Sequence, residues 1–249
     1  MERLPKLAAS LQWGCVSNMK SELMRCKNIS TLLLIVFLSM CLPLIHVSGK
    51  VRNLELNETP FRLQDGDLIF QRSSSQLGPV FEIVLGSKIT HVGVVFIEND
   101  SAFVYEAKNK VTKTELDRWI SRGVGRQFAA MRLRNADSLL TENTLAEIRR
   151  ELDKHVGKPY DTRFKWSDDR MYSTELVYKA FERGADIKLG RIERFGDFKF
   201  DDKLVKFWID MYFPDGPNLD ERVITPISIF YDTKLETIFT TMPERGSIW

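Results

Sequence analysis

Short apolar runs bounded by turn residues divide the chain after residue 60 into predicted strands. A turn at 64–66 introduces the first of them, and the run HVGVVFI, which begins at His91, is the strongest strand pattern in the sequence. Asn99 and Asp100 predict a tight turn into the next strand, so that the two strands form a hairpin. The segments predicted as strands are 67–70, 91–97, 102–107 and 127–133.

Apolar positions that recur every three to four residues predict helices between and after these strands. Thr144 and Glu147 match a capping box, and the helix that they begin is expected to end at Gly157. One of the serines at 73–75 is expected to cap a helix that ends at Gly86. The other predicted helices are 115–122, 171–183 with Gly184 as its stop, and 202–212, before an irregular, proline-containing tail. Because strands and helices mix without regular βαβ alternation, the pattern predicts one α+β domain.

The N-terminal segment has a different pattern. An apolar run, Ile29–Ile45, is preceded by basic residues and followed by small ones, as in a secretory signal peptide. We expect residues 1–49 to be a signal peptide cleaved before Lys50, and 50–249 to be a single domain of a secreted, periplasmic or cell-envelope protein. The alternative is a retained membrane anchor, because a predominantly apolar run of 17 residues is long enough to span a bilayer.

Charge and cysteine content exclude several classes of function for the rest of the chain. The formal net charge of +2 comes from the first 49 residues, which hold five basic and two acidic groups, so the remainder has a slight acidic excess. This balance argues against nucleic acid as the main partner. All three cysteines precede residue 50, which excludes a disulfide framework, a zinc–cysteine site and a cysteine nucleophile from the remainder. No metal-ligand cluster or phosphate loop is apparent, and we expect neither metal nor cofactor.

Two histidines lie after residue 50, and only one of them suggests chemistry. His155 falls in the last turn of a predicted helix, where the helix dipole favours a cation. His91 begins a strand, and Glu106 ends the next strand of the hairpin, so the two side chains are expected to come within reach of each other. A carboxylate beside an imidazole fixes its tautomer and stabilises its protonated form. The alternative is a surface His–Glu pair without a role.

Ser173 is expected at the start of a helix, where backbone N–H groups and the helix dipole stabilise negative charge. A nucleophile at this position would have an anion site beside it for a tetrahedral intermediate. The alternative is an ordinary helix cap, because a serine before Thr174, Glu175 and Leu176 also matches an N-cap.

Three blocks of sequence carry a family resemblance. They are 65–71 (DGDLIFQ), then 90–93 (THVG) with 104–107 (VYEA), then 157–161 (GKPYD) leading to 166–177 (WSDDRMYSTELV). Together they resemble the permuted papain-like amidases of the NlpC type, in the YiiX-like subgroup. The resemblance covers about residues 60–230 and implies a small, barrel-like antiparallel sheet packed against helices, with the nucleophile at a helix N-terminus.

By position, the resemblance implies that His91 is the base, Glu106 its orienter and Tyr172 a residue of the substrate pocket. Ser173 stands where the family has its nucleophilic cysteine. A serine hydroxyl does not ionise near neutral pH, so it would depend on His91 to take its proton during attack. Three interpretations of Ser173 therefore stay open: the protein is a working serine hydrolase, it is a natural pseudoenzyme, or the serine is an engineered change that inactivates it.

The resemblance implies hydrolysis or acyl transfer at an amide or ester bond, with cell-wall peptides or lipid-like acyl groups as substrates. The alternative is a non-catalytic envelope protein that binds a peptide or acyl chain in the same cleft. The N-terminal apolar segment could also associate with a membrane.

Overall fold

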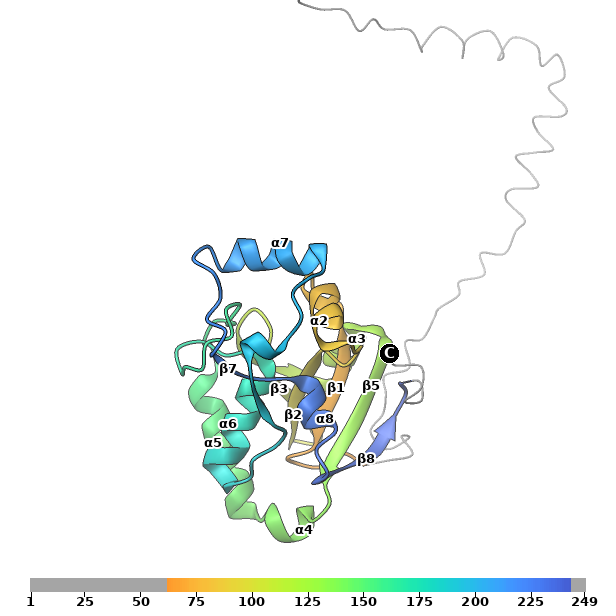
Figure 1. Cartoon of the computed structure of the whole chain (residues 1–249). Coiled ribbons are helices and arrows are strands. Elements are labelled where there is room, and N and C mark those ends of the chain that lie inside the picture. Colours follow the sequence, from red (N-terminus) through yellow and green to blue (C-terminus); the bar gives the residue numbers. More distant parts are fainter. Residues whose placement is uncertain (1–61, 243–249) are drawn as a thin grey trace, which may run out of the picture. The chain divides into compact units, whose positions relative to one another are not determined.

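The structure is a computed structural model that describes residues 62–242 (Figure 1). Six strands form one sheet in the order β4-β3-β2-β1-β5-β8, and each neighbouring pair is antiparallel. These strands are β1 (Leu68–Ser73), β2 (His91–Glu98), β3 (Ser101–Ala107), β4 (Val111–Glu115), β5 (Gly123–Leu133) and β8 (Leu235–Thr240). A separate pair joins β6 (Ile192–Arg194) to β7 (Arg222–Ile224).

Helices lie against both faces of the sheet. They are α2 (Gly78–Leu85), α3 (Leu116–Ser121), α4 (Ala136–Leu139), α5 (Glu142–His155), α6 (Ser173–Ala185), α7 (Lys203–Tyr212) and α8 (Pro226–Phe230), with a 3-10 turn at Phe195–Asp197. Helix α5 packs along α6, which contacts β2, and α2 packs against α7 at one end of the molecule (Figure 1). The predicted α+β class is confirmed.

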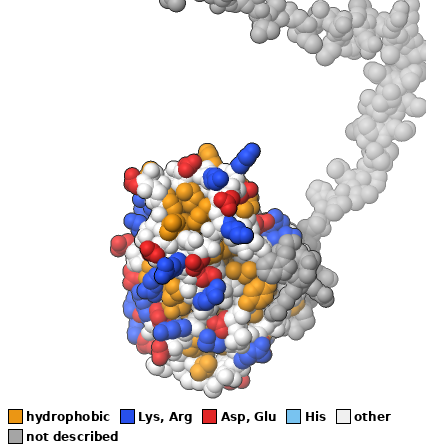
Figure 2. Space-filling view, viewed as in Figure 1, with side chains coloured by type: hydrophobic (Ala, Val, Ile, Leu, Met, Phe, Trp, Pro, Cys, Tyr) orange, Lys and Arg blue, Asp and Glu red, His pale blue; other side chains and the backbone are white. Residues whose placement is uncertain are grey.

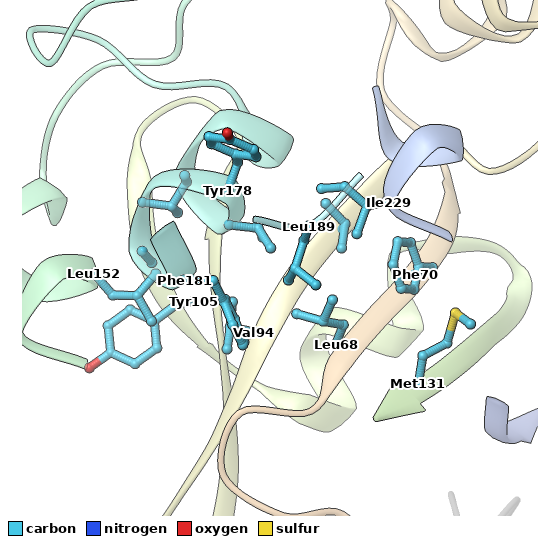
Figure 3. Packing of buried hydrophobic residues seen from close by; sticks show 14 of the residues in the cluster. Leu68, Phe70, Val94, Tyr105, Met131, Leu152, Tyr178, Phe181, Leu189 and Ile229 are labelled. Atoms are coloured by element: carbon cyan, nitrogen blue, oxygen red, sulfur yellow. The ribbon is translucent and has the colours of Figure 1, made fainter. Parts of the chain in front are cut away.

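Alternation along the strands divides the core into two layers. One face of the sheet packs on α5 and α6, and its side chains include Leu68, Phe70 and Val94 (Figure 3). The opposite face packs on α3, where Trp119 is fully buried against its neighbours. Successive residues of β2 therefore contact different helices, and this alternation determines where the functional side chains point.

Two predicted helix starts are wrong. Ser73 is still paired with Gly123 in the sheet, so α2 begins only at Gly78, without a side-chain cap. Helix α5 begins at Glu142, because the Thr141 hydroxyl accepts a hydrogen bond from the backbone N–H of Thr144 at 3.2 Å. The true cap thus lies three residues before the predicted one. The helix itself ends at His155, and the predicted stop Gly157, with a φ of 90°, follows the C-cap Val156.

Gly184 lies inside α6 instead of ending it. A Cβ atom at this position would lie 2.6 Å from the backbone nitrogen of Ile148, so the glycine permits α5 and α6 to approach closely. The helix ends at Ala185, and its C-cap is Asp186, which has a left-handed φ of 55°. Met171 forms a bridge with Tyr160 and precedes the helix.

The chain after residue 212 is more regular than predicted. It contributes β7, α8 and β8, and β8 pairs with β5 to complete the large sheet. Strand β4 was also not predicted. The leader or anchor expected at 1–49 lies outside the described residues and stays a prediction, as does the extent of the domain over 50–249. Among the described residues, no helix is both long enough and apolar enough to cross a bilayer.

Candidate active site

Strands β2 and β3 bring His91 and Glu106 together. Val94 pairs with Tyr105, and this register places Glu106 beside Gly93, on the same face of the sheet as His91. A Cβ atom at Gly93 would lie 2.7 Å from the Tyr105 carbonyl oxygen, so only glycine lets the two strands approach this closely. The His91 Nε2 and Glu106 Oε2 atoms are 2.7 Å apart, within hydrogen-bond distance.

Glu106 is fully buried and is held ionised by its neighbours. Its Oε1 atom accepts a hydrogen bond from the Thr114 hydroxyl at 2.7 Å and another from the Arg122 guanidinium. Burial acts to raise the pKa of Glu106, but the hydrogen bonds from His91, Thr114 and Arg122 outweigh it and lower the pKa to about 2. The carboxylate is therefore charged at any physiological pH and can stabilise a protonated imidazole.

The imidazole of His91 is fixed on a second side by Trp119. The two rings stack with centroids 5.9 Å apart and an interplanar angle of 22°. The ionised Glu106 can only accept a hydrogen bond, so the neutral imidazole of His91 carries its proton on Nε2 and donates it to Glu106. This leaves Nδ1 as the nitrogen able to accept a proton. His91 is 8% exposed, so solvent has little access to it.

Sequence reasoning did not identify Thr114, Trp119 or Arg122 as neighbours of the pair. All three belong to β4, α3 or the residue that follows α3. The helix at 115–122 was expected, but the sequence carries no signal that places it over His91, since this contact depends on the pairing of β3 with β4.

Ser173 is the first residue of α6, and Tyr172 occupies the N-cap position without a side-chain capping bond. The interpretation of Ser173 as an ordinary N-cap is therefore wrong. The N–H groups of a first helical turn have no intrahelical partner, so the Ser173 hydroxyl lies where anions are stabilised. Ser173 is 5% exposed and lines a pocket with a volume of about 70 Å³.

The pocket is apolar. Eight aromatic side chains contribute to its wall: Phe81, Tyr160, Phe164, Tyr172, Phe195, Phe198, Phe200 and Trp208. None of the described residues that line it is charged. The hydroxyl of Tyr172 accepts a hydrogen bond from the Ile224 N–H at 3.1 Å, and the Thr174 hydroxyl donates to the Ile224 carbonyl at 2.6 Å. These polar groups are thus satisfied within the protein wall.

Ser173 and His91 are not joined by a hydrogen bond in the described part of the chain. Thr90, which precedes His91, lines the same pocket as Ser173. Alternation along β2 directs Val92 toward α6, whereas His91 lies on the face where Trp119 packs. The structure therefore brings His91 and Glu106 into contact, and it places Ser173 and Tyr172 in one pocket. The pair and the pocket are neighbours at the start of β2, where Thr90 lines the pocket and His91 belongs to the pair.

His155 is not the cation that its place in a helix suggested. It is buried at the end of α5, and its Nδ1 atom lies 3.0 Å from Lys158 Nζ. Burial, followed by the charge of Lys158, lowers the pKa of His155 to about 4, so the ring is neutral at pH 7. The described residues contain no group of three or more His, Cys, Asp or Glu side chains that could hold a metal ion.

Comparison with known proteins gives consistent matches. The model of the family described as "Permuted papain-like amidase enzyme, YaeF/YiiX, C92 family" matches residues 62–239. The uncharacterized protein YiiX of Escherichia coli K12 is 28% identical over 180 residues, which cover 72% of this chain and 88% of the relative. The crystal structure of metalloprotein yiiX from Escherichia coli O157:H7 superposes with a TM-score of 0.68 at 28% identity, over 72% of this chain and 98% of that one. These matches confirm the predicted permuted papain-like fold.

Proposed function

We propose that this chain, which belongs to the YaeF/YiiX, C92 family of permuted papain-like amidases, cleaves an amide or ester bond by acyl transfer through Ser173. In this proposal His91 is the general base and Glu106 orients it. The observation that carries the proposal is the buried His91–Glu106 hydrogen bond, which the family's hydrolytic chemistry can use directly. Because of the expected leader, we further propose that the protein acts at the cell envelope.

The proposed reaction has two steps. The Ser173 Oγ attacks the carbonyl carbon of the substrate, while His91 Nδ1 accepts the hydroxyl proton and the carbonyl oxygen becomes an oxyanion. The backbone N–H groups of a first helical turn lack intrahelical partners, so those of α6 are suitable donors to this oxyanion. Collapse breaks the bond to the leaving amine or alcohol, which takes the proton from His91. Water then attacks the acyl-enzyme with His91 again as base, releasing the carboxylic acid and restoring Ser173.

Glu106 supports this reaction by remaining ionised while the imidazole gains and loses its proton. A serine needs such a partnership more than a cysteine does, because its hydroxyl cannot exist as a stable anion near neutral pH. The proposal requires Ser173 Oγ and His91 Nδ1 to reach hydrogen-bond distance when substrate is bound, as catalytic hydrogen bonds often tighten on binding.

The pocket favours a lipid-like acyl chain over a cell-wall peptide. Cell-wall peptides carry carboxylate and ammonium groups, and burying an unpaired charge is costly. An acyl chain needs only apolar surface, which the aromatic wall beside Ser173 supplies. The Escherichia coli relative is described as a metalloprotein. The described residues of this chain gather no group of three or more His, Cys, Asp or Glu side chains, and we assign no step to a metal.

A fluorophosphonate probe tests the nucleophile directly. Wild-type protein should be labelled, and Ser173→Ala should not be; His91→Ala should slow labelling strongly, because the hydroxyl loses its base. Ser121, on α3, offers a matched serine whose replacement by alanine should leave labelling unchanged.

The second candidate, a protein that binds an acyl chain without cleaving it, predicts a different result. The wild-type chain would then remain unlabelled, while Ser173→Ala would still bind a fluorescent fatty acid in the pocket. Absence of both labelling and binding would contradict both candidates.

A further inference from the structure

Helix α7 exposes an unusual amount of apolar surface. Leu204, Phe207 and Met211 are 42%, 61% and 56% exposed, and their spacing of three and four residues places them on one side of the helix. Isolated exposed hydrophobic residues are common, but a continuous stripe on one helix suggests an interaction surface. We call these three residues the α7 stripe.

The side of α7 next to the stripe belongs to the pocket. Val205 and Trp208 are buried, and Trp208 forms part of the pocket wall. Helix α2, which packs on α7, also contributes Phe81 to that wall and exposes Ile83 at 44%. Hydrophobic side chains gather at the surface just below α7 in Figure 2. One short helix thus lines the pocket with one side and exposes an apolar stripe on the adjacent side.

Charges near the stripe are nearly balanced. Lys203 and Lys206 are exposed on α7, and their long side chains can extend past the stripe toward polar groups. Asp202 is used as the N-cap of the helix, through hydrogen bonds from two backbone N–H groups, and Asp210 lies near the other end. Attraction to an anionic surface is therefore weak, and any binding by this face depends mainly on its apolar side chains.

We propose that α7 docks into the interfacial region of a lipid bilayer and thereby places the pocket beside its acyl substrate. The choice of substrate rests on the proposed function, but docking itself does not require catalysis. Half-exposed apolar side chains on one short helix offer far less area than the roughly 800 Å² per partner of a stable protein interface. They suit a helix that lies in the plane of a membrane, where shallow burial of one face is sufficient.

The chain before the described residues supports the same partner. The apolar run ends at Ile45, and residues 46–61 join it to the described part. Fully extended, a segment of that length reaches at most about 55 Å. If the run is retained as an anchor, the described part stays close to the bilayer at all times; if it is cleaved, α7 has to provide the contact alone.

An environment-sensitive dye can identify which face meets the bilayer. The full chain with Cys15, Cys26 and Cys41 replaced by serine would carry NBD at Phe207→Cys. The control is NBD at Val156→Cys, because Val156 is similarly exposed, at 48%, but follows α5. Vesicles of phosphatidylcholine, with and without phosphatidylglycerol, should shift the Phe207→Cys emission to the blue and leave the control unchanged. Raising the salt concentration should have little effect, since the contact is apolar.

Other outcomes would overturn the proposal. Equal shifts at both positions, or none at either, would mean that α7 is not the docking face. A blue shift at Phe207→Cys without vesicles would show that protein covers the stripe. Repeating the measurement with Ser173→Ala separates the two proposals, because docking should persist without the nucleophile. Intact docking in a chain that fluorophosphonate does not label would reject the proposed catalysis alone.

Discussion

Replacing Glu106 by glutamine removes the buried charge while keeping nearly the same shape. The ionised carboxylate is stabilised in the folded state, because its pKa falls from an ordinary 4.5 to about 2. At 1.36 kcal/mol for each pH unit, this difference corresponds to about 3 kcal/mol of folding stability. Since the folded pKa is depressed, that stability is fully present above about pH 4.5 and is lost as the pH falls through about 2.

We therefore expect Glu106→Gln to lower the free energy of unfolding at pH 7 by about 3 kcal/mol, because Arg122 loses its buried counter-charge. Urea unfolding of both proteins between pH 7 and pH 2.5 measures the effect. The difference between them should shrink as the pH decreases below 4.5, because the Glu106 carboxyl of the unfolded wild-type chain then binds a proton, whereas in the folded chain, with a pKa of about 2, it stays ionised. Taking this difference also removes the contributions of other carboxylates.

Thr114→Val is the matched control. It removes one donor to the ionised Glu106 and keeps the charge, so it should cost about 1.5 kcal/mol, and this cost should change less with pH. If Glu106→Gln were as stable as wild type at pH 7, or if its deficit did not change with pH, the carboxylate would not be the buried, ionised group described here. The electrostatic basis of the candidate site would then be wrong.

Three further predictions concern the helices around the pocket. With the leader cysteines replaced by serine, Ser173→Cys should react with iodoacetamide near pH 6 faster than a free cysteine, and His91→Ala should slow it; an unreactive thiol would contradict the inherited site. Gly184→Ala should destabilise the protein by about 1–3 kcal/mol in urea unfolding, despite alanine's better helix propensity, because its Cβ atom meets the backbone of Ile148. Burial raises the pKa of Glu175 to about 7, so folding stability from this group falls as the pH rises from about 4.5 to 7. Glu175→Gln should flatten that part of the pH profile, and an unchanged slope would refute the assignment.

Local sequence patterns predicted the elements that carry the candidate site. The strand beginning at His91 and the turn at Asn99 and Asp100 depend on neighbouring residues, and both are present with the hairpin that they imply. The pattern failed where a longer-range contact decided the outcome. Gly184 resembled a helix stop, but it is retained inside α6 because α5 crosses there, and this crossing has no local signal.

The same distinction explains which site residues were missed. The contact between Glu106 and His91 can be predicted from the hairpin alone, because pairing of the two strands brings these residues close together. Arg122 reaches Glu106 only because α3 is folded back over the sheet after β4, and an arginine after a short helix gives no indication of such a contact.

The two histidines after residue 50 show how surroundings, and not residue type, determine a chemical role. His155 is buried beside Lys158, and Lys179 and Arg183 add further positive charge, so protonation is unfavourable and its pKa is lowered to about 4. His91 is almost as buried, but its Nε2 atom is hydrogen-bonded to the ionised carboxylate of Glu106. A base must accept a proton and survive as a cation long enough to return it. Only His91 has the fixed negative charge that such a cycle requires, and this asymmetry supports assigning the base to β2 rather than to α5.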